Sequence, residues 1–398
     1  DLVSILGGAN NIFPAFPAMA ADMGVDKVGI QQTISVYLAA YALMSLVHGP
    51  LSDAIGRKRV ILAGLVVFIA ASVGCAMARD LPTLLVFRAL QGLSAGVGLI
   101  VGRAVIRDVF HGDDAQRVMS QVSMIFGVAP AIAPIIGGWL LGWGRWPLIF
   151  WFLVLFSVAL LMATWRWLPE THLQGARMPL KPARLTRDYI AIALNPRFQR
   201  LAAAGAFNFC ALFLFIASAP AFVMDILKLN ERQFAWFFIP MIGGMMRGAS
   251  LSGRAAGRIS GVRLANIGFG CSAVAVALNV GYSLLVAQPT VPWAVVPIAL
   301  NAFGIALVFP ILTLAVLDMY PRQRGSASSL QAFTGLVLNA AVAGVLSPMI
   351  SHDPLYLALA AAFFMLVGWV FWRWELQRGH GGSDKPGSPA ILDSTDHL

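Results

Sequence analysis

The sequence has few charged residues, few cysteines and few histidines. Only 12% of its 398 residues are Asp, Glu, Lys or Arg, whereas 59% are hydrophobic, and the mean hydropathy is +0.77. This composition excludes a water-soluble globular protein. The three cysteines, Cys75, Cys210 and Cys271, lie far apart inside apolar stretches, so neither a disulfide framework nor a metal site is predicted.

Hydrophobic stretches long enough to cross a bilayer recur along the whole chain. Each crossing needs ~20 apolar residues, and twelve such spans are predicted, at residues 2–20, 30–50, 60–78, 82–106, 117–141, 147–168, 199–224, 232–252, 264–287, 293–317, 326–350 and 355–376. The predicted fold is therefore an all-α integral membrane protein of twelve transmembrane helices. Because the first span starts almost at residue 1 and the sequence begins without Met, we expect a short native leader before it.

The basic residues are distributed unevenly over the predicted loops. Alternate loops hold 20 of the 28 Lys and Arg residues, the opposite loops hold 5, and the remaining 3 lie within spans. Loops rich in Lys and Arg are cytoplasmic, so this side and both chain termini are predicted to face the cytoplasm. The net charge of +10 is thus an orientation signal, and no nucleic-acid partner is expected.

The longest predicted connection divides the chain into two six-helix halves, residues 1–168 and 199–376. Residues 169–198 contain four prolines and spaced charges, which is typical of a cytoplasmic linker. A weak repeat supports the division, because SDAIGRKRV at residues 52–60 resembles AGRISGVRL at residues 256–264. Two duplicated halves are typical of a transporter. The final segment, 377–398, is rich in Gly, Ser, Asp and Pro and is predicted to be a disordered cytoplasmic tail.

The loop GPLSDAIGRKR, residues 49–59, combines a carboxylate with a turn glycine and three cations. Asp53 can pair with a cation or cap the N-terminus of a neighbouring helix in one conformation, and release of that contact would permit rocking. We therefore predict a loop that controls the conformational equilibrium, and its key residues are Gly49, Asp53, Gly56, Arg57 and Lys58.

Several motifs together resemble the major facilitator superfamily, specifically its Bcr/CflA-type branch of drug:proton antiporters. The loop above matches the GxLxDxxGRK signature, FRALQGLSAG (87–96) resembles the branch's RxxQG motif through Arg88, Gln91 and Gly92, and VGRAVIRDVF (101–110) resembles the segment that follows. The fifth span resembles the exporter-type Pro/Gly motif through Gly127, Pro130, Pro134, Gly137 and Gly138. The resemblance implies the fold of that superfamily and drug export coupled to protons.

Arg88 is predicted to lie inside the fourth span, where an isolated cation is costly and therefore a functional candidate. The alternative is that the Arg88 side chain extends outward to the lipid headgroups and has no functional role. In the resembling family this arginine takes part in proton coupling, and Gln91 could hold its orientation by a hydrogen bond. For Arg103, near the inner end of the same span, a helix-end role and a substrate contact are both open.

The first span departs from the resembling family. Members typically carry an aspartate where this chain has Asn10, and an amide cannot carry a proton at accessible pH. Of the 18 acidic residues, all but Asp1 fall at loops, span ends or the tail. Either Asp1 enters the membrane, another group titrates, or coupling is lost. The proton-coupling candidates are Arg88, Gln91, Asn10 and Asp1.

The sequence predicts a multidrug exporter of the bacterial inner membrane that works by alternating access on amphipathic small molecules. The expected partners are a drug or metabolite, protons and the bilayer; the expected assembly is a monomer with no cofactor or metal, driven by the proton gradient. An uncoupled facilitator is the alternative that Asn10 favours, and a polytopic enzyme would need a His or carboxylate constellation that the sequence does not offer. The residues predicted to line the substrate cavity are Asn10, Asn11, Gln31, Tyr37, Tyr41, Arg103, Asn208, Phe209, Phe213, Ser218, Asn301 and Asn339.

Overall fold

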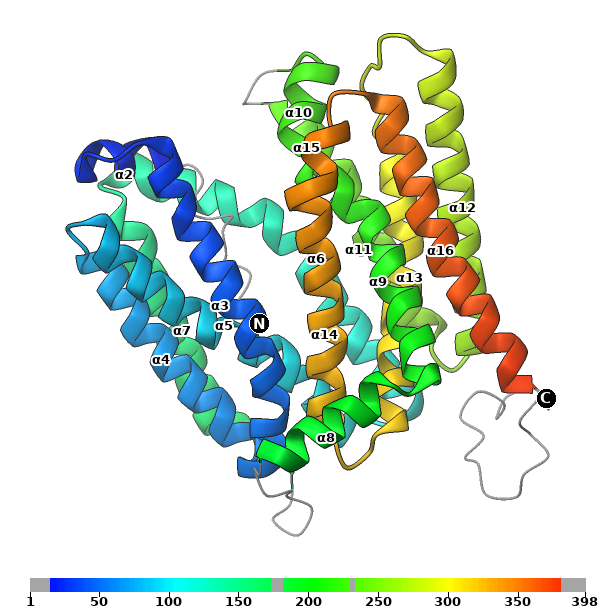
Figure 1. Cartoon of the computed structure of the whole chain (residues 1–398), viewed down its shortest axis with the longest axis horizontal. Helices are drawn as coiled ribbons and strands as arrows, with labels where there is room; N and C mark the ends of the chain where they lie inside the picture. The colour runs from blue at the N-terminus through cyan, green and yellow to red at the C-terminus, as the bar shows by residue number, and fades with distance from the viewer. Residues whose placement is uncertain (1–14, 173–181, 230–232, 381–398) are drawn as a thin grey trace. The chain divides into compact units, whose positions relative to one another are not determined.

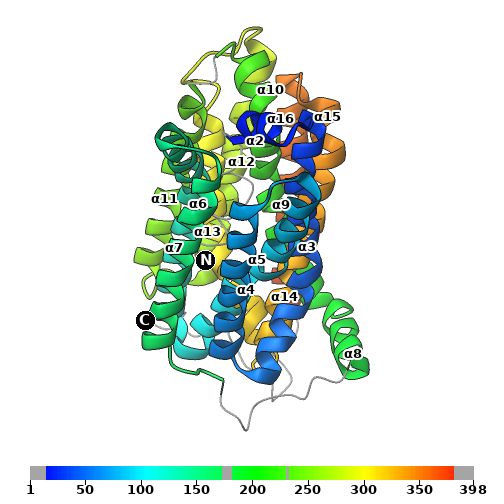
Figure 2. The same cartoon turned by 90° about the vertical axis from the view of Figure 1, so that its left-hand side faces the viewer.

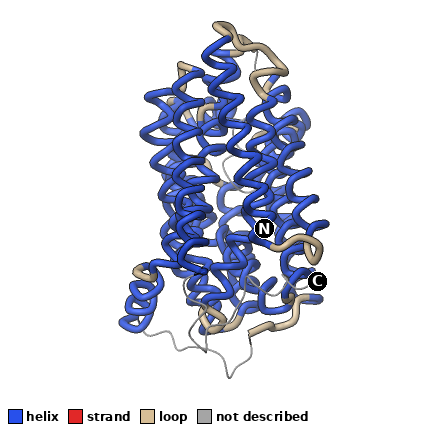
Figure 3. The backbone as a smooth tube through the Cα atoms, turned by 90° about the vertical axis from the view of Figure 1, so that its right-hand side faces the viewer, coloured by secondary structure: helices blue, strands red, loops and turns tan. Residues whose placement is uncertain are grey.

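The computed structural model describes residues 15–172, 182–229 and 233–380, and this part of the chain contains helices and no strands (Figure 3). In chain order (Figure 1), the elements are α2 (Phe16–Met23), α3 (Lys27–Ile55), α4 (Arg57–Met77), α5 (Leu81–Val109), α6 (Gly112–Trp143), α7 (Pro147–Trp167), α8 (Pro182–Ala193), α9 (Pro196–Ala217), α10 (Ala219–Ala221), η4 (Phe222–Ile226), α11 (Ala235–Ala255), α12 (Gly261–Leu285), α13 (Val296–Met319), α14 (Arg324–Ala341), η6 (Val342–Leu346), α15 (Ser347–Ile350) and α16 (Pro354–His380).

Every predicted span from the second onward contains a helix, and the all-α membrane fold is confirmed. Among the described residues, nine helices are long and apolar enough to cross a membrane. Most of the first predicted span lies outside the described residues, and α2 covers only its end. Two predicted spans are not single α-helices, because the seventh continues from α9 through α10 into the π-helix η4, and the eleventh contains the π-helix η6.

The chain forms two compact units. Unit 1 comprises residues 1–109, 128–190 and 320–333, and unit 2 comprises residues 110–127, 191–319 and 334–398. Unit 1 therefore includes residues 320–333 from the predicted C-terminal half, and unit 2 includes residues 110–127 from the predicted N-terminal half. The first residues of α6 belong to unit 2, and the first residues of α14 belong to unit 1.

In unit 1, α5 packs against α3 and α4, and α4 also packs against α7 (Figure 2). Their shared core contains Phe68, Leu84 and Phe150, each nearly inaccessible to solvent. At one end, the Asp22 carboxylate accepts hydrogen bonds from Arg145 and from Trp146 Nε1 at 2.9 Å. The hydrogen bond from Trp146, together with the smaller effect of the Arg145 charge, lowers the pKa of Asp22 below its usual value. This contact ties α2 to the start of α7.

In unit 2, α9 packs against α16, and α13 packs against α9, α11 and α12. Glu375 of α16 is buried and accepts hydrogen bonds from Arg197 Nε at 2.7 Å and Arg200 Nε at 2.8 Å. Trp372, also buried, donates from Nε1 to Asn266 Oδ1 on α12. These polar contacts fix α16 against the start of α9 and against α12.

The predicted linker contains a helix, α8, which the sequence analysis did not anticipate. One side of α8 is apolar, with Ile192 buried, while Arg187 is exposed. The Tyr189 hydroxyl donates a hydrogen bond to the Leu46 carbonyl of α3, and burial raises the pKa of this phenol. Hydropathy could not reveal α8, because twelve residues of mixed polarity are too few for a membrane span.

Glycines allow α12 and α13 to approach each other closely. A Cβ added to Gly268 would lie 2.7 Å from the Gly304 carbonyl oxygen, and one added to Gly304 would lie 2.5 Å from the Gly268 oxygen. Backbone atoms on both sides cannot move aside as a flexible side chain would. Close approach at small residues is a general feature of helix packing in membranes.

We expect Gly268→Ala to destabilise unit 2 by about 1–3 kcal/mol, because overpacking forces α12 and α13 apart. Gly270→Ala on the same helix is the matched control, since a Cβ there meets no atom within 4 Å, and it should leave stability unchanged or raise it by up to about 1 kcal/mol. Thermal unfolding in detergent compares the two variants. Equal melting temperatures would contradict the close contact.

Candidate functional site

Asp53 is buried at the end of α3 and accepts four hydrogen bonds. Its Oδ1 atom accepts from Arg57 Nη1 at 2.6 Å and from the Gly325 backbone N at 3.2 Å. Its Oδ2 atom accepts from the Ser326 backbone N at 2.9 Å and from the Ser326 hydroxyl at 3.0 Å. The carboxylate therefore pairs with a cation and caps the N-terminus of α14 at the same time, and both contacts are favourable for a negative charge.

The ion pair of Asp53 extends into a chain of four charges. Arg57 Nε donates to Asp108 Oδ2 at 3.0 Å, and Arg324 Nη1 donates to Asp108 Oδ1 at 2.7 Å. The side chains of Arg57 and Asp53 are 1% and 3% exposed. Burial of single charges would be very costly, and here two carboxylates face two guanidinium groups. We call Asp53, Arg57, Asp108, Arg324 and Ser326 the Asp53 cluster.

Two glycines bring α3 and α14 into backbone contact beside the Asp53 cluster. A Cβ on Gly49 would lie 1.9 Å from the Gly325 carbonyl oxygen, and one on Gly325 would lie 2.4 Å from the Gly49 oxygen. The Gly49 backbone N also donates to Ser329 Oγ at 2.9 Å. Only glycine at both positions permits this approach, so the loop motif and the start of α14 form one packed surface.

The other loop residues order the start of α4. Gly56 has φ of 113°, in the region that favours glycine, and separates α3 from α4. The Arg57 backbone N donates to Glu170 Oε1 at 2.8 Å, which caps α4 with an acid. Lys58 Nζ donates to the Trp165 carbonyl oxygen at 2.8 Å, near the end of α7. The motif thus connects α3, α4 and the end of α7.

Arg88 is fully buried in α5, inside unit 1. Its Nη1 atom donates to Gln91 Oε1 at 2.8 Å, its Nε atom donates to the Thr33 carbonyl oxygen at 3.3 Å, and its guanidinium carbon lies 4.3 Å from the centre of the Tyr37 ring. Gln91 Nε2 in turn donates to Ser72 Oγ at 2.7 Å. Arg88 thus points into the helix bundle of unit 1, and the predicted hydrogen bond with Gln91 is present.

The remaining cavity candidates of unit 1 lie on α3 and α5. Tyr37 and Tyr41 stack with ring centres 6.5 Å apart, and Tyr37 contacts Arg88 as described. Arg103 is 8% exposed, so its guanidinium lies within the helix bundle rather than on an outer surface. The structure therefore places Tyr37, Tyr41, Arg88 and Arg103 along one pair of packed helices.

The cavity candidates of unit 2 form smaller groups. Phe209 and Phe213 stack on α9 with ring centres 6.2 Å apart. Asn339 Oδ1 accepts from Cys210 Sγ at 3.3 Å, and the hydroxyls of Ser218 and Ser347 lie 2.7 Å apart. Two further candidates are buried within the helix packing, Asn208 on α9 and Asn301 on α13.

Some predicted residues lie outside the part of the chain that can be described. Asp1, Asn10 and Asn11 precede residue 15, and the side chain of Gln31 is outside the described ones. In the fifth-span motif, the backbone of α6 is helical throughout, and Gly137 is buried. The side chains at the other motif positions are outside the described set, namely those of Gly127, Pro130, Pro134 and Gly138.

The sequence analysis missed three members of the Asp53 cluster, namely Asp108, Arg324 and Ser326. Asp108 lies in the VGRAVIRDVF segment that carried part of the resemblance, and a signal was therefore present. Ser326 and Arg324 lie in RGSASS, a run of small residues at the start of the eleventh span, where a close helix approach could have been suspected. Asp53 and Ser326 are more than 200 positions apart in the sequence, so only the folded structure shows that they are in contact.

The chain belongs to the Major Facilitator Superfamily, whose family profile matches residues 2–343. It is a multi-pass membrane transporter, not an enzyme. It is 27% identical over 247 residues to the Bicyclomycin resistance protein homolog of Haemophilus influenzae, covering 62% of this chain and 62% of that protein's length. It is 28% identical over 334 residues to Multidrug resistance protein D of Escherichia coli, covering 83% and 82% of the two chains.

A solved structure supports the fold. The crystal structure of the human organic anion transporter MFSD10 (TETRAN) superimposes with a TM-score of 0.73 over 94% of this chain and 96% of that one, at 18% sequence identity. At this identity the likeness concerns the fold alone. The predicted helical fold is thereby confirmed, and the family profile confirms the predicted superfamily.

We expect Asp53→Asn to loosen the first turn of α14. The amide keeps one acceptor oxygen but loses the charge that Arg57 and the helix N-terminus stabilise, and breaking a buried ion pair costs about 3–5 kcal/mol. Amide hydrogens of Gly325 and Ser326 should exchange faster, by roughly 100-fold or more, as hydrogen–deuterium exchange with mass spectrometry can measure.

Asp114→Asn is the matched control, because Asp114 and Arg117 form a pair whose side chains are 67% and 53% exposed. Such exposed pairs contribute about 0–1 kcal/mol, so exchange near α6 should hardly change. Unchanged exchange at the start of α14 in Asp53→Asn would show that the carboxylate does not hold that helix.

Proposed function

We propose that this transporter is a drug exporter of the bacterial cytoplasmic membrane that works by alternating access. The observation that carries the proposal is the Asp53 cluster, a buried set of contacts made of discrete hydrogen bonds and ion pairs between α3, α5 and α14. Such contacts are either formed or broken, and they suit a two-state element better than a continuously deformable one.

The loop containing Asp53 would control the exchange between conformations. With the cluster formed, the carboxylate is neutralised by Arg57 and by the N-terminal dipole of α14. With the cluster broken, water replaces these partners and hydrates the separated charges, so the two states can have similar free energies. Small biases from substrate or protons would then shift the population between them.

Amphipathic drugs are the proposed substrates. The two relatives described above are named for resistance to bicyclomycin and to multiple drugs, and the candidate residues combine aromatic rings with amides and hydroxyls. A site with aromatic walls and few polar groups suits such molecules. The basic ends of the helices would face the cytoplasm, together with both termini, by the distribution of Lys and Arg.

Proton antiport would supply the driving force, with Arg88 as the central charged group. A buried arginine keeps its charge, so it influences a nearby acid or a bound substrate through its electrostatic field rather than by releasing a proton itself. Whether an acidic side chain lies near Arg88 would then depend on positions 1 and 10, which hold Asp1 and Asn10. An uncoupled facilitator remains the second candidate, because Asn10 replaces the acid typical of the resembling branch.

We expect Arg88→Ala to reduce drug flux about tenfold or more while the protein still inserts, and Arg88→Lys to restore it only in part. Lysine keeps the charge but lacks the planar group that reaches Gln91 and Thr33 while stacking on Tyr37. Arg79→Ala, nine positions earlier and exposed, is the control. Uptake of fluorescent amphipathic drugs into everted vesicles measures the flux, and normal flux in Arg88→Ala would eliminate its central role.

If an acid in the first span is the proton site, drug flux in the unmodified protein should depend weakly on the proton gradient, because Asn10 cannot titrate, and Asn10→Asp should increase that dependence by supplying a titratable group. Flux into everted vesicles would be compared with and without an ionophore that collapses the gradient, and Asn11→Asp would serve as the neighbouring control. Full dependence in the unmodified protein would show that another group, with Asp1 the first candidate, carries the proton.

A further inference from the structure

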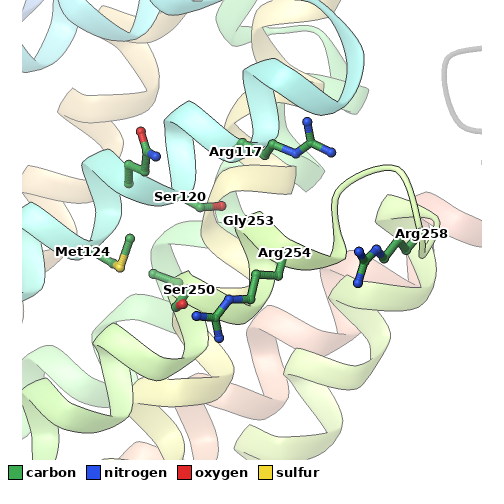
Figure 4. A pocket seen from close by; sticks show the side chains of 9 residues that line it. Arg117, Ser120, Met124, Ser250, Gly253, Arg254 and Arg258 are labelled. Carbon is green, nitrogen blue, oxygen red and sulfur yellow. The ribbon is translucent and has the colours of Figure 1, made fainter.

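Unit 2 contains a pocket of about 550 Å³ between α6 and α11. Figure 4 shows its lining, with Arg117, Ser120 and Met124 on α6, Ser250, Gly253 and Arg254 on α11, and Arg258 on the turn that follows α11. Three arginines and no acidic residue line it. Nothing in the transport mechanism above uses this pocket.

Two of the three arginines are uncompensated. Among the described residues, the side chains of Arg254 and Arg258 have no hydrogen-bond or ion-pair partner, whereas Arg117 pairs with the exposed Asp114 at 2.9 Å and donates to the Ala256 carbonyl oxygen at 3.4 Å. The other nearby acid is Asp113, beside the Gly257 turn, and it does not line the pocket. The pocket therefore carries an excess of positive charge, although Arg254 and Arg258 are exposed to solvent.

The internal repeat relates this turn to the loop of unit 1, and by the same offset Arg254 and Arg258 correspond to Pro50 and Ala54. Gly257 stands 204 positions after Asp53, so the turn of unit 2 has a glycine where the loop of unit 1 has its buried carboxylate. In unit 1, two acids neutralise Arg57 and Arg324. In unit 2, the arginines gather at the corresponding turn, and the acid beside that turn is Asp113 of α6.

The repeat also explains why there is space for a ligand between α6 and α11. Gly49 in unit 1 corresponds to Gly253 in unit 2, again 204 positions later. A Cβ on Gly49 would overlap the partner backbone at 1.9 Å, whereas one on Gly253 would lie 3.5 Å from Ser120 Cβ, an ordinary contact. The seam between α6 and α11 is thus wider than the seam between α3 and α14, and a ligand can enter it.

We propose that this pocket binds a phosphate-bearing anion, which takes the place of the missing carboxylate. Guanidinium groups bind phosphate oxygens in pairs, and Ser250 also lines the pocket, whereas the Ser120 hydroxyl donates to the Gln116 carbonyl oxygen at 2.8 Å. The ligand bridges α6, through Arg117, to the end of α11, through Arg254 and Arg258. It adds to the direct contacts there, in which Gln116 Nε2 donates to the Ser252 carbonyl oxygen at 3.0 Å.

The phosphate can come from a membrane lipid or from a soluble anion. Exposed apolar side chains stand next to lining residues in the sequence: Ile125 on α6, Leu251 on α11 and Ile259 after α11. The positive-inside distribution puts this end at the level of the headgroups. Basic pockets between transmembrane helices on the cytoplasmic side commonly hold anionic headgroups. The two sources share the same recognition chemistry and differ in how they are delivered.

The test uses the full chain in nanodiscs at constant ionic strength. One series contains phosphatidylcholine with increasing phosphatidylglycerol, and a second contains phosphatidylcholine alone with added inorganic phosphate, or chloride as the control. The melting temperature is measured for the wild type, for Arg254→Gln/Arg258→Gln, and for Arg166→Gln/Arg187→Gln. The last variant removes two exposed arginines that do not line the pocket.

Phosphatidylglycerol should raise the melting temperature of the wild type and of Arg166→Gln/Arg187→Gln. In Arg254→Gln/Arg258→Gln, the phosphatidylglycerol fraction that gives half of this shift should increase about five-fold for each arginine removed. A shift with inorganic phosphate alone, lost in the same variant, would assign the site to a soluble anion. No shift with either anion, or equal shifts in all three proteins, would overturn the proposal. The comparison is made within each protein, so a uniform loss of stability does not affect it.

Discussion

Arg57 has almost no contact with solvent, and the arrangement of unit 1 at this end depends on how its charge is neutralised. Asp53 and Asp108 lie on either side of its guanidinium, and Arg324 balances the second acid. Because an isolated buried ion is far more costly than a paired one, the ends of α3, α5 and α14 must stay together while Arg57 is buried. If these helices separate, the charges must be hydrated instead. The same ion chain therefore stabilises one conformation and sets the free energy needed to leave it.

Arg88 resolves the same physical difficulty in a different way. Its described partners are neutral: a carbonyl oxygen, an amide oxygen and an aromatic ring. The carbonyl and amide dipoles and the ring face are all electron-rich, so each of them stabilises the buried cation. Ser72 fixes Gln91, which fixes Arg88, and this chain of hydrogen bonds orients the cation before any ligand arrives. In the proposed mechanism this oriented cation serves coupling, whereas the closed ion chain around Arg57 holds helices together.

Hydropathy predicted the helices well because a span must be long, apolar and hydrogen-bonded within itself, and each of these properties is local. It failed for α8, whose stability comes from docking through Tyr189 and Ile192 rather than from its own composition. For the site, the type of contact made by Asp53 followed from its chemistry, since a carboxylate near a helix end seeks a cation or free amides. The contacts of Asp53 with Ser326 and of Arg57 with Asp108 did not follow, because loop spacing says nothing about residues far along the chain. The same reason limited the cavity candidates, whose direction depends on how each helix is rotated in the packed bundle.

The two halves of the repeat show how a duplicated scaffold acquires different electrostatics at equivalent positions. At the first seam, Gly49 and Gly325 allow backbone contact, and Asp53 turns that contact into a capped helix with a neutralised arginine. At the second seam, Gly253 and Gly257 stand where the first has Gly49 and Asp53. The carboxylate of Asp53 therefore has no equivalent there, and the arginines that line the pocket can bind an anion. A seam closed by internal charges responds to events within the protein, such as protonation or substrate binding. A seam with unmatched cations responds to the composition of its surroundings, because its counter-charge must come from outside.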